Sequence, residues 1–204
     1  MVTPFLGILQ TVTQWDQSLF ELVNSGLANP FFDAVTPFLR NSMNWAPLYL
    51  FLLLFMLMNF KARGAWWAIF FLVTVAATDM VGTYIFKHNI MRLRPCNDPS
   101  MAGHVRLLLD HCAGGSSFIS NHAANHFGMA AFFFITTRQV LGSWSKAGFF
   151  WAFAIAFSQV YVGVHYPLDA ICGALLGVAL GLLTGSFFNR TFGFAIFDNQ
   201  PAAN

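Results

Sequence analysis

Between residues 158 and 169 the chain reads SQVYVGVHYPLD, a stretch with several polar residues where one long apolar segment ends and the next begins. His165 and Asp169 lie four residues apart in it, and Pro167 between them suits the first turn of a new helix. On such a helix the two side chains share one face, so the carboxylate could hold one ring nitrogen and leave the other as a nucleophile. The alternative is a polar pair that only stabilises a tight turn between two helices.

The composition is that of a membrane protein. Of the 204 residues 57% are hydrophobic, 17% are aromatic and only 9% are charged, whereas roughly a quarter of a soluble domain is charged. We therefore expect one membrane domain over residues 1–204. The net charge of +2 comes from ten basic and eight acidic residues scattered along the chain, which does not suggest a nucleic-acid partner. The N-terminus does not read as a removable signal peptide, so internal segments are expected to direct insertion.

Five apolar segments approach or exceed the roughly 20 residues that a bilayer-spanning helix needs. They cover residues 45–60, 65–86, 123–137, 147–164 and 168–188. The predicted fold is therefore all-α, a polytopic transmembrane helical bundle over residues 45–188. Residues 1–40 mix apolar and polar side chains at helical spacing, which predicts a helical region lying in the membrane interface. Pro30 and Pro37 are expected to break this region into short pieces.

The basic residues predict the orientation of the bundle, because short cytoplasmic loops tend to retain Lys and Arg. The ends of the first, third and fifth segments carry such cations: Lys61, Arg63, Arg138, Lys146 and Arg190. These ends are therefore predicted to face the cytoplasm. The connection 87–121 and the turn at 165–167 then lie on the extracytoplasmic side, together with the N-terminal region.

Two further polar stretches fall on that same side. The first, KHNIMRLRP at residues 87–95, holds Lys87 and Arg94 where the orientation rule disfavours cations, so a bound anion would explain them. Attraction to lipid head groups is the alternative. The topology rests on the positions of basic residues and on no motif, yet it places all the polar stretches on one face of the membrane. This agreement favours a single site.

The second stretch, SNHAAN at residues 120–125, predicts a helix N-terminus. Ser120 is a good N-cap, and the unpaired N–H groups of the first turn form an anion site with the helix dipole. His122 is placed there as a general acid, unless it only satisfies hydrogen bonds at the membrane boundary. His122 and His126 also have the spacing of zinc ligands, but the glutamate of the zinc motif is missing. We therefore expect no metal site, and expect His126 to be a packed polar residue.

Together the three stretches resemble the signature blocks of the type 2 phosphatidic acid phosphatase (PAP2) superfamily, whose fold is shared with vanadium haloperoxidases. The matching residues are Lys87 with Arg94 and Pro95, then Ser120, Asn121 and His122, then Ser158, His165 and Asp169. The resemblance covers residues 87–169 and implies a PAP2/haloperoxidase-like core and a membrane phosphatase without metal or other cofactor. It implies that His165 attacks phosphorus, Asp169 orients it and His122 protonates the leaving group. The implied phosphate-binding residues are Lys87, Arg94, Ser120, Asn121 and Gln159.

Two positions depart from the family pattern. The second block usually reads Ser-Gly-His, and here Asn121 replaces the glycine. The third usually opens Ser-Arg, and here Gln159 keeps hydrogen-bond donors but loses the positive charge. One arginine that contacts the transition state is worth on the order of 10³ to 10⁵ in rate in some phosphoryl-transfer enzymes. We therefore expect a slow enzyme, unless Arg92 or Arg106 compensates.

Cys96 and Cys112 both lie in the predicted outer connection, close to two of the polar stretches. In an oxidising compartment they would form a disulfide that holds the two ends of the connection together. The alternative is a pair of free thiols.

Two features inside the apolar segments need partners. Asp79 would either support Lys87 or bond a neighbouring helix, because a carboxylate in a membrane span is costly alone. Glycines recur every fourth residue from Gly173 to Gly185, which predicts close helix packing, either within the bundle or between protomers of a homo-oligomer.

These features favour a phosphatase that acts on a membrane lipid phosphate or diphosphate at the outer face of a bacterial inner membrane, through a phosphohistidine. Candidate substrates are undecaprenyl diphosphate, phosphatidylglycerol phosphate, phosphatidic acid and lipid A phosphate. The alternative is a catalytically weak lipid-phosphate binding or translocating protein, for which Gln159 is the motive. A haloperoxidase is a weaker interpretation, because those relatives are soluble and this chain has five apolar segments.

Overall fold

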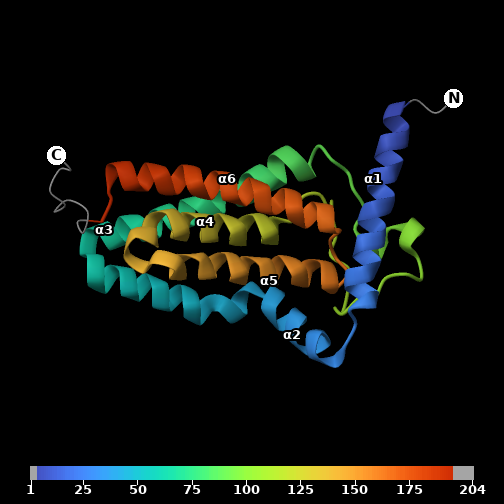
Figure 1. Cartoon of the computed structure of the whole chain (residues 1–204), viewed down its shortest axis with the longest axis horizontal. Coiled ribbons are helices and arrows are strands. Elements are labelled where there is room, and N and C mark those ends of the chain that lie inside the picture. The colour runs from blue at the N-terminus through green and yellow to red at the C-terminus, as the bar shows by residue number, and fades with distance from the viewer. Residues whose placement is uncertain (1–3, 195–204) are drawn as a thin grey trace.

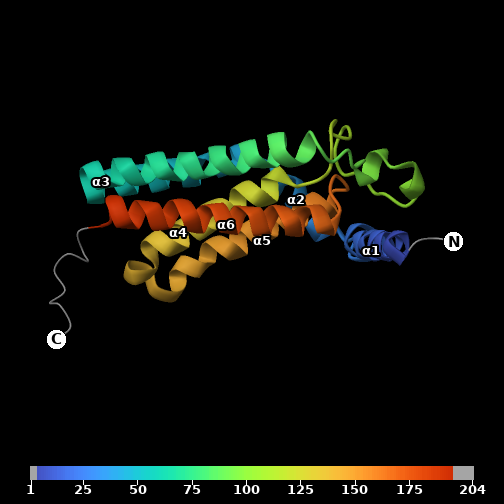
Figure 2. The same ribbon diagram turned by 90° about the horizontal axis from the view of Figure 1, so that it is seen from above.

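The computed structural model describes residues 4–194, and within that range the regular structure is entirely helical (Figures 1 and 2). The main helices are α1 (Pro4–Glu21), α2 (Pro30–Arg40), α3 (Ala46–Met80), α4 (Asn121–Leu141), α5 (Ala147–Tyr161) and α6 (Pro167–Thr191). Short turns of helix accompany them: η1 (Leu22–Gly26), η2 (Ser42–Trp45), η3 (Val81–Lys87), η4 (Pro95–Asn97), η5 (Pro99–Met101) and η6 (Gly142–Lys146). Three stretches of the described chain are long and apolar enough to cross a membrane: Ser42–Lys87, Asn121–Tyr161 and Pro167–Thr191. The predicted all-α membrane fold is confirmed at this level.

Two of these stretches reverse direction along their length. The first turns at Lys61, which has a φ of 48° inside α3, and Figure 1 shows the two arms of α3 meeting at the left end of the bundle. The arms lie so close that a Cβ on Gly64 would run into the main-chain carbonyl of Met56. The second turns at Gly142, with a φ of 52°, between α4 and α5. The two arms of α3 with α4, α5 and α6 therefore make five rods, close to the five predicted segments.

Glycines on α6 let this helix approach α4 closely. A Cβ on Gly177 would run into the carbonyl oxygen of Ala124, and Gly173 and Gly181 meet the α4 main chain in the same way. A backbone atom cannot move aside as a flexible side chain can, so these positions exclude even a methyl group. The four-residue spacing therefore serves packing within the bundle.

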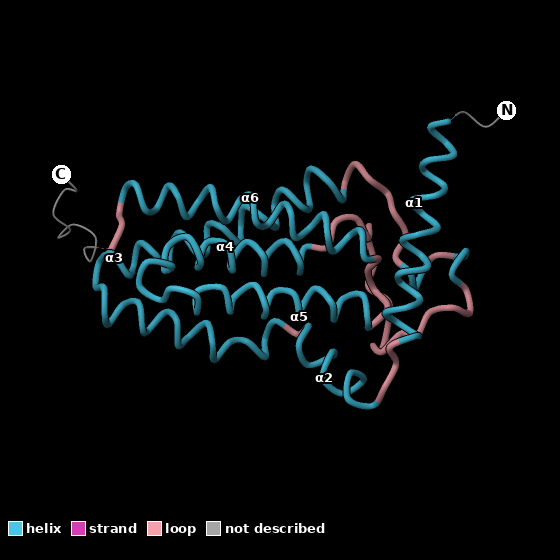
Figure 3. The backbone as a smooth tube through the Cα atoms, viewed as in Figure 1, coloured by secondary structure: helices cyan, strands magenta, loops and turns pink. Residues whose placement is uncertain are grey.

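The N-terminal helices lie at the end of the bundle opposite the reversal of α3. Figures 1 and 3 show α1 lying across this end, where the long loop between α3 and α4 also gathers. Helix α2 packs on α5 through Phe32, whose ring centroid lies 5.6 Å from those of Phe157 and Tyr161. Pro30 begins α2, but Pro37 lies inside it, so the predicted break at Pro37 is wrong. One proline removes a single backbone hydrogen bond, and packing on α5 holds the helix across that loss.

Candidate active site

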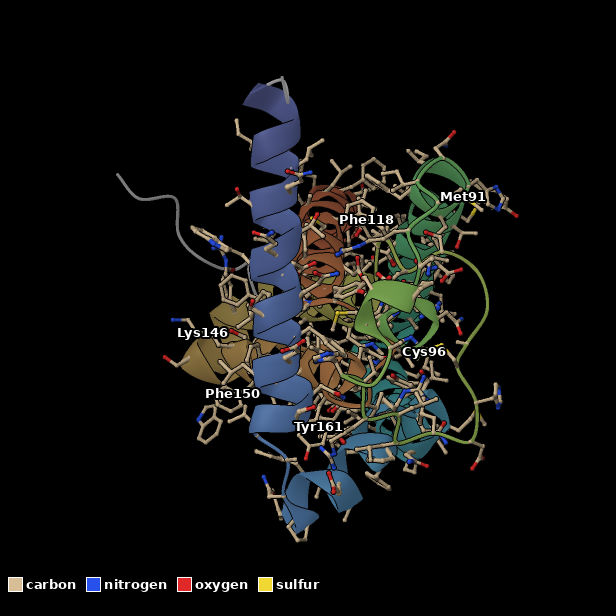
Figure 4. The ribbon with its side chains drawn as sticks, turned by 90° about the vertical axis from the view of Figure 1, so that its right-hand side faces the viewer. Met91, Cys96, Phe118, Lys146, Phe150 and Tyr161 are labelled. Carbon is tan, nitrogen blue, oxygen red and sulfur yellow. A yellow bond between two sulfur atoms is a disulfide. The ribbon has the colours of Figure 1, made fainter. Side chains whose placement is uncertain are left out.

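The three polar stretches meet at the end of the bundle that faces the viewer in Figure 4, where Met91 of the first stretch lies to the right of α1. Arg94 Nη1 lies 3.1 Å from His165 Nε2, which joins the first stretch to the third. The main-chain N–H of Ser120 donates to the carbonyl of Asp169 at 3.0 Å, which joins the second to the third. The fold therefore gathers residues that the sequence places in three separate segments.

His165 is held from both ring nitrogens. Its Nδ1 lies 3.6 Å from Asp169 Oδ2, and its Nε2 faces the guanidinium of Arg94. The side chain is almost fully buried, and burial lowers the pKa of His165 to about 4 although the hydrogen bond and charge of Asp169 oppose this. The imidazole is therefore neutral at pH 7. With the proton on the nitrogen that faces the carboxylate, the lone pair of Nε2 accepts the hydrogen bond from Arg94, and it becomes a nucleophile only when Arg94 turns to a bound phosphoryl group.

Asp169 is fully buried and has several partners besides His165. Its Oδ2 accepts hydrogen bonds from Ser117 Oγ and, at 2.8 Å, from the main-chain N–H of Tyr166. Its Oδ1 lies 2.6 Å from Arg92 Nη1. This carboxylate is therefore fixed and charged, as a group that orients a histidine must be. Sequence reasoning missed Ser117 and the pairing with Arg92, because neither belongs to a recognisable motif.

Helix α1 contributes a second carboxylate to this cluster. Asp16 Oδ2 lies 2.5 Å from Arg92 Nη2, and Asp16 Oδ1 accepts the main-chain N–H of Leu168 in the first turn of α6 at 2.8 Å. Burial raises the pKa of Asp16, and its bonds to Arg92 and Leu168 oppose that rise. The interfacial helix is thus bonded directly to the residues that hold His165.

The structure does not support compensation for Gln159 by Arg92 or Arg106. Arg92 is committed to the two carboxylates of Asp16 and Asp169. Arg106 makes a two-pronged ion pair with Asp33 on α2, at 2.9 and 2.8 Å. Both guanidinium groups are held by carboxylates, so neither is free to replace the charge that Gln159 lacks.

Gln159 itself is fully buried on α5, and its side-chain nitrogen and oxygen have no hydrogen-bond partner among the described residues. Its main-chain oxygen accepts the N–H groups of Val164 and His165, at 3.3 and 3.2 Å. Backbone bonds therefore tie this position to the turn that carries His165. An unsatisfied buried amide costs about 1–3 kcal/mol, so an incoming polar group would be favoured there.

His122 lies in the first turn of α4, as predicted, and its ring makes no hydrogen bond within the described part of the chain. It is close enough to Lys87, His165 and Arg40 for their charges to act on it. The ring of His126 runs nearly parallel to it, with centroids 6.3 Å apart. His122 is therefore available to a ligand at the same end of the bundle as His165.

His126 lies one turn deeper and is a packed polar residue, as expected. Its Nδ1 lies 2.7 Å from the carbonyl oxygen of His122, its Nε2 lies 3.4 Å from the hydroxyl of Tyr49, and its ring packs on Trp151. Residues 4–194 contain no cluster of three His, Cys, Asp or Glu side chains suited to a metal ion.

Ser120 caps α4, with its Oγ accepting the N–H of Ala123 at 3.4 Å, so the predicted N-cap is confirmed. Lys87 ends η3 and donates to the carbonyl of Ser116 at 3.3 Å. Its ammonium group therefore lies against the loop that leads into Ser120.

The side chain of Asn121 is bonded to α3 and η3. Its Nδ2 donates to Asp79 Oδ1 and to Thr83 Oγ1, both at 2.9 Å. Asn125 also reaches the same oxygen of Asp79, at 3.4 Å. Asp79 therefore bonds the neighbouring helix α4, one of its two predicted roles. The amide nitrogen of Asn121 is occupied and its Oδ1 can only accept, which leaves the main-chain N–H as the donor for phosphate.

Cys96 and Cys112 form a disulfide, with their Cα atoms 5.9 Å apart. Of the two alternatives left open by the sequence, the structure has the bonded pair. The bond closes the part of the loop that lies between Arg94 and Ser117. It therefore restrains two segments that contact His165 or Asp169.

Comparison with known proteins places this site in a family. Residues 67–192 match the model of the PAP2 superfamily. The lipid A 4'-phosphatase of Bacteroides thetaiotaomicron is 29% identical over 173 residues, which cover 83% of this chain and 75% of that protein. The crystal structure of the PAP2-type phosphatidylglycerolphosphate phosphatase from Bacillus subtilis aligns with a TM-score of 0.68 at 21% identity, covering 89% of this chain and 88% of that one. That of Aquifex aeolicus LpxE aligns with a TM-score of 0.59 at 24% identity, covering 82% and 93%.

The two structural likenesses concern the fold, whereas the family match spans more than half of the chain and includes all three polar stretches. The bundle, the gathered histidines and the paired carboxylate agree with that match. The chain therefore belongs to the PAP2 superfamily and is a membrane phosphatase of the PAP2 type.

Proposed function

We propose that the protein removes phosphate from a membrane lipid phosphate or diphosphate through a phosphohistidine formed on His165. The observation that carries this proposal is that each ring nitrogen of His165 faces a charged partner, Nδ1 toward Asp169 and Nε2 toward Arg94. An imidazole held in this way keeps Nε2 unprotonated beside the cation that attracts the phosphate, so a phosphoryl group that takes over the hydrogen bond of Arg94 frees the lone pair for attack.

The proposed reaction has two steps. His165 Nε2 attacks phosphorus, the bond from phosphorus to the lipid oxygen breaks, and His122 gives that oxygen a proton. Water then attacks the phosphohistidine and gives a proton back to His122, and the P–N bond breaks to release phosphate. Lys87, Arg94 and the first-turn N–H groups of α4 bind the phosphoryl oxygens in both steps, where fixed charges favour the transition state.

The proposed membrane arrangement places all five rods across the bilayer, with the site at the extracytoplasmic end. It is supported by the cations at the opposite ends of the rods, among them Lys61 and Arg138. Helix α1 would rest in the outer interface, since Trp15 is 74% exposed and Ile8 is 64% exposed. The bundle at 45–188, the interfacial region at 1–40 and the outer connection at 87–121 form one domain in this proposal.

Among the predicted substrates, lipid A phosphate has the best support. The matched Bacteroides protein is named lipid A 4'-phosphatase and aligns with most of this chain. Undecaprenyl diphosphate, phosphatidylglycerol phosphate and phosphatidic acid remain the comparison substrates. A bacterial inner membrane is the proposed location.

The test is phosphate release from these four lipids by the parent protein and by His165→Ala and His165→Asn, in EDTA. We expect release by the parent alone, inhibition by vanadate, and an acid-labile phosphohistidine in quenched reactions. Equal release by the parent and both variants would refute the mechanism.

A second candidate is a lipid-phosphate binding or translocating protein with weak catalysis. It is favoured by one observation, the uncharged and unpartnered side chain of Gln159. This alternative predicts saturable lipid binding without phosphate release above that of His165→Ala.

A further inference from the structure

We propose that Arg40, the last residue of α2, is the third cation of the phosphate site and supplies the charge that Gln159 lacks. This inference rests on the proposed function and assigns to it a substrate-binding residue outside the family motifs. The ligand that Arg40 would contact is the phosphoryl group of the lipid.

Arg40 differs from the arginines around it in having no partner. Its Nε is buried and makes no hydrogen bond among the described residues, and its guanidinium forms no ion pair in that range. By contrast, Arg92 is held by two carboxylates and Arg106 by one. A buried donor left unsatisfied costs about 1–3 kcal/mol, and more when it is charged. An anionic ligand that accepts hydrogen bonds from Arg40 would remove this free-energy cost.

The end of α2 is fixed close to the two histidines of α4. Trp45 Nε1 donates to the carbonyl of Leu39 at 2.8 Å, which ties the start of α3 to the last turn of α2. The Trp45 ring packs on Trp151 at 5.4 Å, and Trp151 packs on His126 at 4.8 Å. The residue before Arg40 is therefore linked to α4 through these two tryptophans, which end on the ring of His126.

Arg40 lies close enough to His122 and to Arg94 for its charge to act on both side chains. It acts on the ring of His122, the proposed acid, and on the guanidinium of Arg94, which contacts His165. Burial lowers the pKa of Arg94 and the charge of Arg40 adds to this, whereas Asp169 opposes both. A phosphate bound by both guanidinium groups would relieve this repulsion between Arg40 and Arg94.

Gln159 supplies the matching half of this assignment. The site has a buried neutral amide without a partner at the position where the family carries arginine, and an unpartnered arginine arriving from α2. Helix α2 packs on α5, the helix that carries Gln159, through the contacts of Phe32. A charge moved from α5 to α2 would keep three cations, Lys87, Arg94 and Arg40, around the phosphoryl group.

The first experiment compares Arg40→Gln and Arg40→Lys with the parent, using a lipid phosphomonoester in mixed micelles. Arg138→Gln is the matched control, because that guanidinium lies over Phe134 in the last turn of α4, near the far end of the bundle. We expect Arg40→Gln to lose about 10²-fold in kcat/KM, the scale for one donor to a developing charge, and to bind vanadate more weakly. Arg40→Lys should keep part of both, while Arg138→Gln and all melting temperatures stay near the parent.

The second experiment moves the charge back to α5. Gln159→Arg in the Arg40→Gln background should recover at least tenfold in kcat/KM, although the same change in the parent background should gain little. If Gln159→Arg fails to fold, vanadate affinity in Arg40→Gln and Arg40→Lys decides instead.

Parent-like kcat/KM and vanadate affinity in Arg40→Gln would overturn the assignment. A loss that comes with a lowered melting temperature and unchanged vanadate affinity would also overturn it, because it would indicate a structural role at the C-terminus of α2. The proposed function fails separately, by turnover in His165→Ala equal to that of the parent.

Discussion

Replacing Arg92 by methionine removes the cation that holds two buried carboxylates together. The side chains of Asp16 and Asp169 are 5% and 0% exposed, and each lies 2.5–2.6 Å from a different nitrogen of Arg92. Without the guanidinium, two almost fully buried carboxylates lose the cation that they share. Removing one partner of a buried ion pair costs 3–5 kcal/mol in general.

The lower end of that range applies here. The Arg92 side chain is 22% exposed, and Asp169 keeps its bonds to Ser117 and to the main chain of Tyr166. A loss of about 3 kcal/mol corresponds to a fall of roughly 6–12 °C in melting temperature for a chain of this size. Turnover should fall as well, because the carboxylate that orients His165 loses its strongest partner.

The assay is thermal unfolding in detergent with phosphate release measured on the same samples. Asp16→Asn in the Arg92→Met background should recover part of the lost melting temperature, because it removes one of the two unpaired charges. Arg106→Met is the matched control: its pair with Asp33 is about one-third exposed on each side and is worth at most about 1 kcal/mol. Melting of Arg92→Met within 2 °C of the parent, or strictly additive effects of the two changes, would refute the reasoning.

Three further outcomes follow from the structure. Cys96→Ser with Cys112→Ser, or reduction of the parent, should cost about 3 kcal/mol by the loop-entropy model, seen as a lower melting temperature. Gly177→Ala should lower folded yield and activity by forcing α6 from α4, whereas Gly7→Ala, which meets no atom within 4 Å, should not; equal behaviour would contradict the close packing. His165 should titrate near pH 4 rather than 6.5 in NMR of histidine-labelled protein, with its signal assigned by loss in His165→Asn. Since that depressed pKa means that the unfolded state binds more protons, the stabilisation from neutral His165 is complete above about pH 6.5 and is lost as the pH falls toward 4.

The relative positions of the motif residues could be predicted from their spacing along the chain. One helical turn separates His165 from Asp169, and Ser120 caps the helix that carries His122, so spacing along the chain already determines these relations. Hydropathy likewise predicted five apolar segments that correspond to the five rods, with a break near Lys61 where α3 reverses.

The remaining parts of the site depend on where distant helices dock. Asp16 meets Arg92 across 76 positions of sequence, and Arg40 reaches the site only because α2 packs on α5. Periodicity places a residue on the face of its own helix and does not tell which other helix that face will meet. Ser117 was missed for the same reason, since its partner Asp169 is 52 positions away.

The bond from Asp16 to both Arg92 and Leu168 has a practical consequence for anyone who purifies this enzyme. Helix α1, which carries Asp16, exposes Trp15 and Leu19 and is expected to bind the lipid head-group region. Detergent still covers the transmembrane helices after solubilisation, but the lipid surface that α1 binds is lost. Turnover in lipid nanodiscs should therefore exceed turnover in harsh detergents, because the detergent affects the position of Asp16 and, through Arg92, that of the catalytic residues.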